Sequence, residues 1–238
     1  MHEFAESRKA IEAMIRSGDL EGLLRQAEAI HGHLCPFVSL GVKAGQYAMK
    51  YLDTASTGME EVVAIVECNN CFTDGIQVVT GCTFGNNALI FKDWGKTAVT
   101  VARRADGKAV RLAVKPDYRE RLFEKYPAAG PLFERVVVKR QATHEDLHRF
   151  QHVWEGMAKR ELAAPLEEQL SIKELTLTVP EYAPIFASVV CQCCGEAVME
   201  PKARLKDGRP ICLACAGVEY GYLTGQGLGW ARNLTKAY

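Results

Sequence analysis

Two histidines and a cysteine form a close group near the start of the chain. His31, His33 and Cys35 stand at alternate positions of the segment HGHLCP. Alternate side chains of an extended segment share one face, so the two imidazoles and the thiol would converge. Pro36 disfavours helical geometry at Cys35 and so supports an extended conformation. We therefore predict a metal or thiol site, with Cys35 at the N-cap of a helix that stabilises its thiolate.

Three further cysteines could complete this site. Cys68 and Cys71 follow an apolar segment, and Cys82 lies in the glycine-containing segment TGCTFGN. Thiolates and imidazoles are ligands that suit zinc, iron, nickel or copper rather than magnesium. The structural alternative is that the cysteines are small core side chains and that the histidines bind backbone groups. Because two histidines and a cysteine fall within five residues, we favour the site.

A second cysteine cluster lies near the C-terminus. Cys191 and Cys194, then Cys212 and Cys215, form two CxxC pairs separated by seventeen residues. This spacing predicts one tetrahedral, structural zinc ion, and a closed four-thiolate site argues against chemistry at that ion. A redox dithiol pair is the alternative, and Cys193 could replace Cys191 or Cys194. The order of elements predicts a small treble-clef or ribbon-like zinc finger.

Four basic residues lie between the two CxxC pairs of this finger, at Lys202, Arg204, Lys206 and Arg209. They could bind phosphate groups, although four charges in a hairpin are more often ordinary solvated surface. We expect the finger to contact a protein partner, with nucleic acid as the less favoured alternative.

Composition excludes several classes of protein. The chain has 238 residues, of which 48% are hydrophobic and 24% charged, and its 29 basic residues balance 29 acidic ones. It can bury a core, and no global charge attracts nucleic acid or an anionic membrane. The charged N-terminus and short apolar runs predict a cytoplasmic protein without membrane segments. Nine cysteines in such a protein indicate ligands or reactive thiols rather than disulfides.

The elements that must position these residues indicate an α+β fold with an antiparallel or mixed sheet. Hydrophobic periodicity and turn signals divide the chain into a core domain, 1–180, and a zinc finger with its tail, 181–238. Within the core, residues 87–114 are expected to form an antiparallel hairpin that turns at Asp106-Gly107. We expect helices over 4–17, 20–30, from 36 onward, 74–79, 118–125 and 143–162, and strands over 61–67, within 87–114 and over 172–179. Thr143 is the expected N-cap of the last helix, with Asp146 three residues later.

Two other segments are interpreted as structural rather than functional. His144, His148 and His152 recur every four residues of a predicted helix, so a metal could bridge two of them, but a solvated helix is the favoured interpretation. The glycine-rich end YGYLTGQGLGWARN is interpreted as a tail, because it lacks the strand and helix of a nucleotide-binding loop. A helix is expected to begin near Ala214.

Several ordered motifs together resemble the FmdE family, which is named for formylmethanofuran dehydrogenase. They are HGHLCP followed by Gly41, then Glu67 with CFTDGIQ, TGCTFGN and DWGKTA, and the terminal quartet resembles the finger that many members carry. The resemblance implies an α+β core, a homodimer, and a cavity built from His31, His33, Cys35, Cys71 and Cys82. Asp74 and Gln77 fall within the motif and are expected to orient the ligands, rather than to bind the ion themselves.

The chain departs from the family pattern at two places, with Phe37 where glycine is frequent and no lysine near Asn86. We expect a metal-binding FmdE-like protein whose core holds zinc, iron or nickel, or reactive thiols at Cys35, Cys71 and Cys82. Its role would be an accessory or redox one in one-carbon or molybdenum and tungsten enzyme metabolism, with enzymatic activity left open. The alternative is a metal-responsive regulator or a metal delivery protein.

Overall fold

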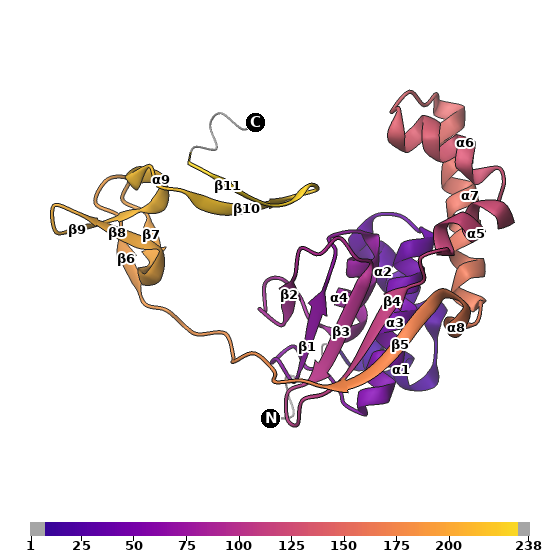
Figure 1. Ribbon diagram of the computed structural model, residues 1–238, viewed down its shortest axis with the longest axis horizontal. Helices are drawn as coiled ribbons and strands as arrows, with labels where there is room; N and C mark the ends of the chain where they lie inside the picture. The colour runs from indigo at the N-terminus through magenta and orange to yellow at the C-terminus, as the bar shows by residue number, and fades with distance from the viewer. Residues whose placement is uncertain (1–7, 233–238) are drawn as a thin grey trace. The chain divides into compact units, whose positions relative to one another are not determined.

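The computed structural model describes residues 8–232. The chain divides into two compact units, Met1–Pro180 and Glu181–Tyr238, which are called the core unit and the finger unit below. Figure 1 shows both units, coloured along the chain. Each unit is described by itself.

A five-stranded mixed sheet forms the frame of the core unit. Its strands are β1 (Val62–Val66), β2 (Leu89–Phe91), β3 (Ala98–Arg103), β4 (Lys108–Val114) and β5 (Leu170–Thr176), in the order β2-β1-β3-β4-β5. Strand β2 pairs with β1 in parallel, and every other pair is antiparallel. Only β3 and β4 therefore form the hairpin expected after residue 87. The loop after β2 crosses the end of β1, where the Lys92 and Lys96 amides donate to the carbonyls of Val66 and Glu67.

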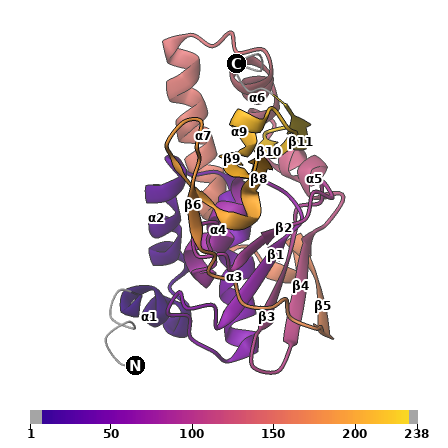
Figure 2. The same cartoon turned by 90° about the vertical axis from the view of Figure 1, so that its left-hand side faces the viewer.

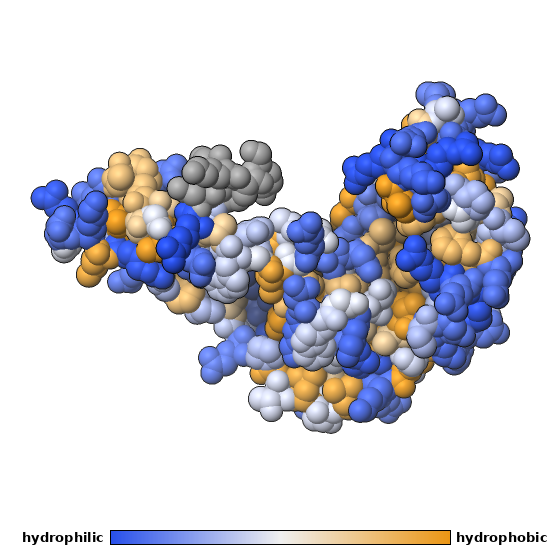
Figure 3. All heavy atoms as spheres, turned by 45° about the horizontal axis from the view of Figure 1, so that its top comes forward, coloured by the Kyte–Doolittle hydropathy of each residue, from blue (hydrophilic) through white to orange (hydrophobic). Residues whose placement is uncertain are grey.

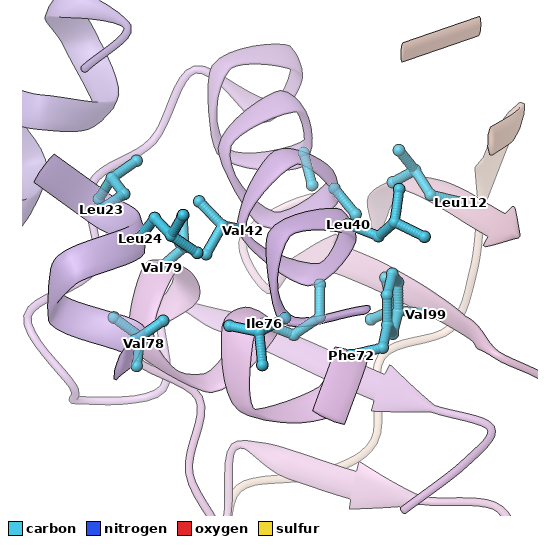
Figure 4. Packing of buried hydrophobic residues seen from close by; sticks show 14 of the residues in the cluster. Leu23, Leu24, Leu40, Val42, Phe72, Ile76, Val78, Val79, Val99 and Leu112 are labelled. Atoms are coloured by element: carbon cyan, nitrogen blue, oxygen red, sulfur yellow. The ribbon is translucent and has the colours of Figure 1, made fainter. Parts of the chain in front are cut away.

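Four helices cover one face of this sheet (Figures 1 and 2). They are α1 (Lys9–Ser17), α2 (Leu20–His31), α3 (Pro36–Leu52) and α4 (Cys71–Thr80). Side chains from α3 and α4 meet those of the sheet in a dry core, as Leu40, Phe72 and Leu112 illustrate with no exposed surface (Figure 4). This burial is the main stabilising contribution to the core unit.

Glycines let α3 and α4 pack backbone to backbone. A Cβ atom at Gly41 would lie 2.1 Å from the Phe72 carbonyl oxygen, and one at Gly75 would lie 2.6 Å from the Val38 carbonyl oxygen. No larger residue fits at either position, because the opposing atoms belong to rigid backbone. This contact lies within two turns of the start of each helix, so it brings the residues at the two helix starts together.

Residues 115–169, called the excursion below, leave the sheet after β4 and return to it at β5. Val114 and Leu170 are register partners, and the Lys115 amide donates to the Gln169 carbonyl at 3.0 Å. The excursion contains α5 (Tyr118–Lys125), α6 (Ala129–Phe133), the π-helical η1 (Glu134–Val138), α7 (His144–Ala163) and α8 (Leu166–Gln169).

Polar contacts tie α7 to α3. The Ser39 hydroxyl donates to the Ala158 carbonyl at 2.9 Å, and the buried Lys43 ammonium donates to the Glu161 carbonyl at 3.1 Å. A capping box between Thr143 and Asp146 fixes the start of α7, as its sequence predicts. Within residues 8–232, none of the helices combines the length and the apolar character that crossing a bilayer requires.

The finger unit is built from short hairpins. Its elements are β6 (Ser188–Val190), β7 (Ala197–Met199), η2 (Glu200–Lys202), β8 (Ala203–Lys206), β9 (Arg209–Cys212), α9 (Leu213–Ala216), β10 (Tyr220–Thr224) and β11 (Gly227–Ala231). The helix expected near Ala214 is a single turn, because Gly217 ends it in the left-handed region with a φ of 62°.

The glycine-rich end was expected to be a tail, and within the described residues this expectation is wrong. It folds as the antiparallel hairpin of β10 and β11. The Trp230 ring packs over Gly221 at ordinary contact distance, whereas a Cβ atom at Gly229 would lie 2.5 Å from the Tyr222 ring, so this ring requires glycine at position 229. Of this segment, only Asn233 lies outside the part of the chain that the structure describes.

Candidate metal and thiol centre

Three potential ligands from three different helices meet in the core unit. His31 is the last residue of α2, Cys35 is the N-cap of α3, and Cys71 is the first residue of α4. One ring nitrogen of His31 and the two sulfur atoms lie within 4.8 Å of one another. We call this group the core site. Gly32, with a φ of 85°, ends α2 in the left-handed region and turns the chain from His31 toward Cys35.

A carboxylate orients the histidine. His31 Nδ1 lies 2.6 Å from Asp74 Oδ2, and Gln77 Nε2 donates to the other oxygen of the same carboxylate at 3.2 Å. His31 Nε2 is buried and has no hydrogen-bond partner among the described residues. Since Nδ1 is engaged by Asp74, Nε2 is the ring nitrogen available to a metal ion, and this is the arrangement that metal-bound histidines commonly have.

The two thiols of the core site differ in acidity. A hydrogen bond between the two thiols lowers the pKa of Cys71, burial opposes this, and the nearby His31 lowers it further. The same hydrogen bond and burial raise the pKa of Cys35. The sequence predicted a stabilised thiolate at Cys35, and the Val38 amide does donate to its sulfur at 3.4 Å. The backbone amides of Val38 and Phe37 lower the pKa of Cys35 but are outweighed, so Cys71 is the thiol of the pair that ionises first.

His33 lies beside the core site but outside the group. Its ring centroid is 4.4 Å from that of His31, and it borders a separate cavity of about 370 Å³ lined also by Leu147, Phe150 and Trp154. Burial and the neighbouring His31 lower the pKa of His33. The structure therefore does not gather His33 with the two thiols, and its role as a ligand stays a prediction.

Cys82 is placed elsewhere in the core unit. Its thiol donates to the Val62 carbonyl at 3.4 Å, and only 1% of the residue is exposed. Burial raises the pKa of Cys82 to about 11. The thiol has the surroundings of a small core side chain, and its expected part in catalysis or metal binding stays a prediction.

Cys68 and the histidine stripe also lie outside the core site. The Cys68 thiol donates to Asn70 Oδ1 at 3.3 Å, at the turn into α4. His144 and His148 have ring centroids 5.3 Å apart on α7. Neither belongs to the groups of three or more potential ligands found within residues 8–232.

An apolar pocket of about 570 Å³ borders Cys71, and we call it the Cys71 pocket. Sequence reasoning missed its lining, because most of it comes from the excursion, whose helical periodicity predicts packing but not a cavity. The residues that line the Cys71 pocket are Pro36, Phe37, Asn70, Cys71, Thr97, Val114, Lys115, Pro116, Tyr118, Arg119, Leu122, Phe123, Phe133 and Trp154.

The finger unit gathers the four cysteines that the sequence paired. The sulfur atoms of Cys191, Cys194, Cys212 and Cys215 lie within 4.8 Å of one another. Backbone amides point at the sulfurs, since the Cys212 amide donates to Cys191 at 3.2 Å and the Cys215 amide donates to Cys212 at 3.4 Å. Such donors stabilise thiolates, and four thiolates in this arrangement fit a tetrahedral zinc ion.

Comparison with known protein families decides the family of this chain. The family described as FmdE, molybdenum formylmethanofuran dehydrogenase operon, matches residues 30–171. The chain belongs to the FmdE family. The match covers the core site, so the resemblance predicted from the motifs is confirmed. The prokaryotic dksA/traR C4-type zinc finger family matches residues 184–221, which confirms the zinc finger.

Two known proteins are similar to this chain over most of its length. A protein from Archaeoglobus fulgidus, named a probable S-adenosyl-L-methionine-binding protein, is 43% identical over 213 residues. The match covers 88% of this chain but 56% of the relative, so this chain spans little more than half of that protein's length. A crystal structure of a tungsten formylmethanofuran dehydrogenase FmdE-like protein from Syntrophus aciditrophicus has 22% identity and a TM-score of 0.52, covering 83% of this chain and 92% of the other. This likeness shows the α+β fold.

Proposed function

We propose that the core site binds one soft transition-metal ion, zinc, iron or nickel, through His31 Nε2, Cys35 Sγ and Cys71 Sγ. The observation that carries this proposal is the buried, unpartnered Nε2 atom of a histidine whose other nitrogen is held by Asp74. A buried polar atom without a partner is costly unless something binds it. Imidazole and thiolate are the donors that such ions prefer.

Three protein ligands leave a coordination position for an exchangeable ligand, as in catalytic rather than structural zinc sites. The metal would supply Lewis acidity at that position. The protein's own contribution is to fix His31 through Asp74 and to border the site with the Cys71 pocket. The finger unit holds a second, structural zinc ion, because its four thiolates complete the tetrahedron.

The proposed role is an accessory one for a molybdenum or tungsten enzyme of one-carbon metabolism, in the cytoplasm. The description of the FmdE family supports this role. It is tested by replacing the chromosomal copy with Cys71→Ser and measuring formylmethanofuran dehydrogenase activity in cell extracts. A loss of activity that a matched Cys68→Ser strain does not show is expected, and equal activity in the two strains contradicts the role.

Metal analysis tests the core site directly. Purified protein is expected to hold two metal equivalents, of which Cys71→Ser loses one and Cys212→Ser loses the other. Cys68→Ser is the matched control, because that thiol lies near α4 but outside the core site. Metal content that is the same in Cys71→Ser and Cys68→Ser would sink the proposal.

Metal-free thiol chemistry is a second candidate, favoured by the proximity of the Cys35 and Cys71 sulfur atoms, which lie within 4.8 Å of one another. The two thiols would form a disulfide, giving two electrons and two protons to an external oxidant. Mass spectrometry after treatment with a disulfide such as oxidised glutathione separates the two candidates. A mass lower by two hydrogen atoms in the linked Cys35 and Cys71 peptides, from protein that never held core metal, supports the dithiol function.

A further inference from the structure

The Cys71 pocket has walls made of aromatic rings. Phe37 and Tyr118 meet edge to face with centroids 5.8 Å apart. On the excursion, Phe133 stacks with Trp154 at 5.9 Å and an interplanar angle of 7°, and Phe123 lies 6.1 Å from Phe133. Figure 3 shows apolar side chains, in orange, gathered where the helices of the excursion meet the rest of the core unit. Flat rings in such walls favour a ligand that is itself planar and aromatic.

Two cations complete the lining. Lys115 and Arg119 border the pocket, and none of the described residues that line it is acidic. The Arg119 guanidinium lies 5.8 Å from the Phe123 ring centroid and 5.3 Å from that of Phe133. Within residues 8–232, neither Lys115 nor Arg119 forms an ion pair with a carboxylate. Their charges are therefore available to a ligand, and a guanidinium fork matches carboxylate or phosphate geometry.

The volume restricts the ligand to a small molecule. About 570 Å³ lies within the range of sites for cofactors and small substrates. A cationic ligand would be repelled by Lys115 and Arg119, and an aliphatic one would not make the additional edge and face contacts that an aromatic ligand makes with these rings.

We propose that the Cys71 pocket binds a planar aromatic or heteroaromatic ring that carries an anionic group. The ring lies among Phe37, Phe133 and Trp154, and the anion pairs with Arg119 and Lys115. The inference rests on the proposed function, because Cys71 is both a proposed metal ligand and part of the pocket lining. It adds the class of molecule that the core site receives.

Isothermal titration calorimetry on the full-length, zinc-loaded protein tests this assignment with three probes. They are 2-naphthoate, the neutral 2-naphthamide, and cyclohexanecarboxylate, which keeps the charge but lacks the aromatic ring. We expect 2-naphthoate to bind at least about tenfold more tightly than either of the others, as a single charge-assisted contact or ring stack typically provides.

Two variants assign the two halves of the recognition. Arg119→Gln changes an exposed side chain and should remove most of the preference for 2-naphthoate over 2-naphthamide. Phe133→Leu should remove the preference for 2-naphthoate over cyclohexanecarboxylate. Arg25→Gln, an exposed arginine of α2 outside the pocket lining, should leave both preferences unchanged. Equal binding of the three probes, or an Arg119→Gln variant that discriminates like the wild type, overturns the inference.

Metal content measured on the same samples separates this failure from that of the proposed function. If the core metal is present but the probes are not discriminated, the ligand class is wrong and the metal site stands. If the probes are discriminated by protein that holds no core metal, the pocket assignment is supported and the metal proposal fails.

Discussion

His31 Nδ1 lies 2.6 Å from Asp74 Oδ2, although the two residues are separated by 43 positions in the chain. This contact joins the end of α2 to the first turn of α4, and it leaves Nε2 as the nitrogen of His31 that is available to a metal ion. The carboxylate thus acts on the core site without being one of its three potential ligands.

Replacing this carboxylate should weaken metal binding without abolishing it. Asp74→Asn keeps the shape of the side chain but loses the charge that holds the ring, so we expect metal affinity to fall roughly 10- to 100-fold. Competition with a chromogenic chelator measures this change. Asp19→Asn, which changes the N-cap of α2 far from the metal ligands, is the control. An Asp74→Asn protein with wild-type affinity would show that the contact does not support the site.

The close contact of α3 with α4 should make the core unit intolerant of one added methyl group. Gly75→Ala forces a Cβ atom against three backbone atoms of α3, so we expect a loss of roughly 3 kcal/mol or more in the free energy of unfolding. Gly156→Ala, within α7, meets no atom within 4 Å and should stabilise the protein by roughly 0.5–1 kcal/mol. Urea denaturation of both variants checks the pair, and equal stabilities would contradict the packing argument.

The buried Cys82 thiol should make the free energy of unfolding fall at alkaline pH. Burial raises the pKa of this thiol from 9.0 to about 11, so the folded state holds its proton more tightly than the unfolded state. The resulting contribution to stability is complete below pH 9 and is lost as pH rises toward 11. Between about pH 8.5 and about pH 10.5, the wild type should lose roughly 1–2 kcal/mol more than Cys82→Ala. Urea midpoints at the two pH values measure this, and parallel losses in both proteins would refute it.

Removing the finger's zinc should unfold the finger unit and spare the core unit. Zinc binding contributes roughly 10–16 kcal/mol in comparable peptides, which exceeds what the few buried apolar residues of this unit supply. We expect Cys212→Ser to become sensitive to trypsin between residues 181 and 232 while the core unit stays intact. Cys193→Ser should behave as the wild type, because this thiol is exposed and lies outside the group of four. Equal protection of Cys212→Ser and wild type would argue against a structural zinc.

The sequence allowed much of the fold to be predicted wherever a local signal decides the structure. The N-cap at Cys35, the turn at Asp106 and Gly107, and the capping box at Thr143 each act within a few residues, and each forms. The prediction that strand β2 belongs to an antiparallel hairpin was wrong. The strand pairs with β1 in parallel, and this pairing depends on hydrogen bonds between residues more than twenty positions apart, which no local signal reveals.

The core site was predicted less completely for the same reason. The extended segment predicted over residues 31–35 does not form, because His31 still belongs to α2 and Gly32 is left-handed. His31 and Cys35 nevertheless lie together with Cys71, whereas the ring of His33 lies beside this group. Which of Cys68, Cys71 and Cys82 faces the histidine depends on how α4 packs against α3. Only Cys71, at the first position of α4, joins the group.

The excursion leaves and rejoins the sheet at paired residues, Val114 and Leu170. The potential metal ligands and most of the lining of the Cys71 pocket therefore lie in different parts of one polypeptide, which Ser39 and Lys43 of α3 connect through hydrogen bonds to α7. If the pocket binds the proposed ligand, exchanges at Arg119, Phe123 and Phe133 of α5 and α6 would change its selectivity without altering α2, α3 and α4, which carry the potential metal ligands. Such a division gives natural variation, and protein engineers, a route to new ligands that does not require rebuilding the centre itself.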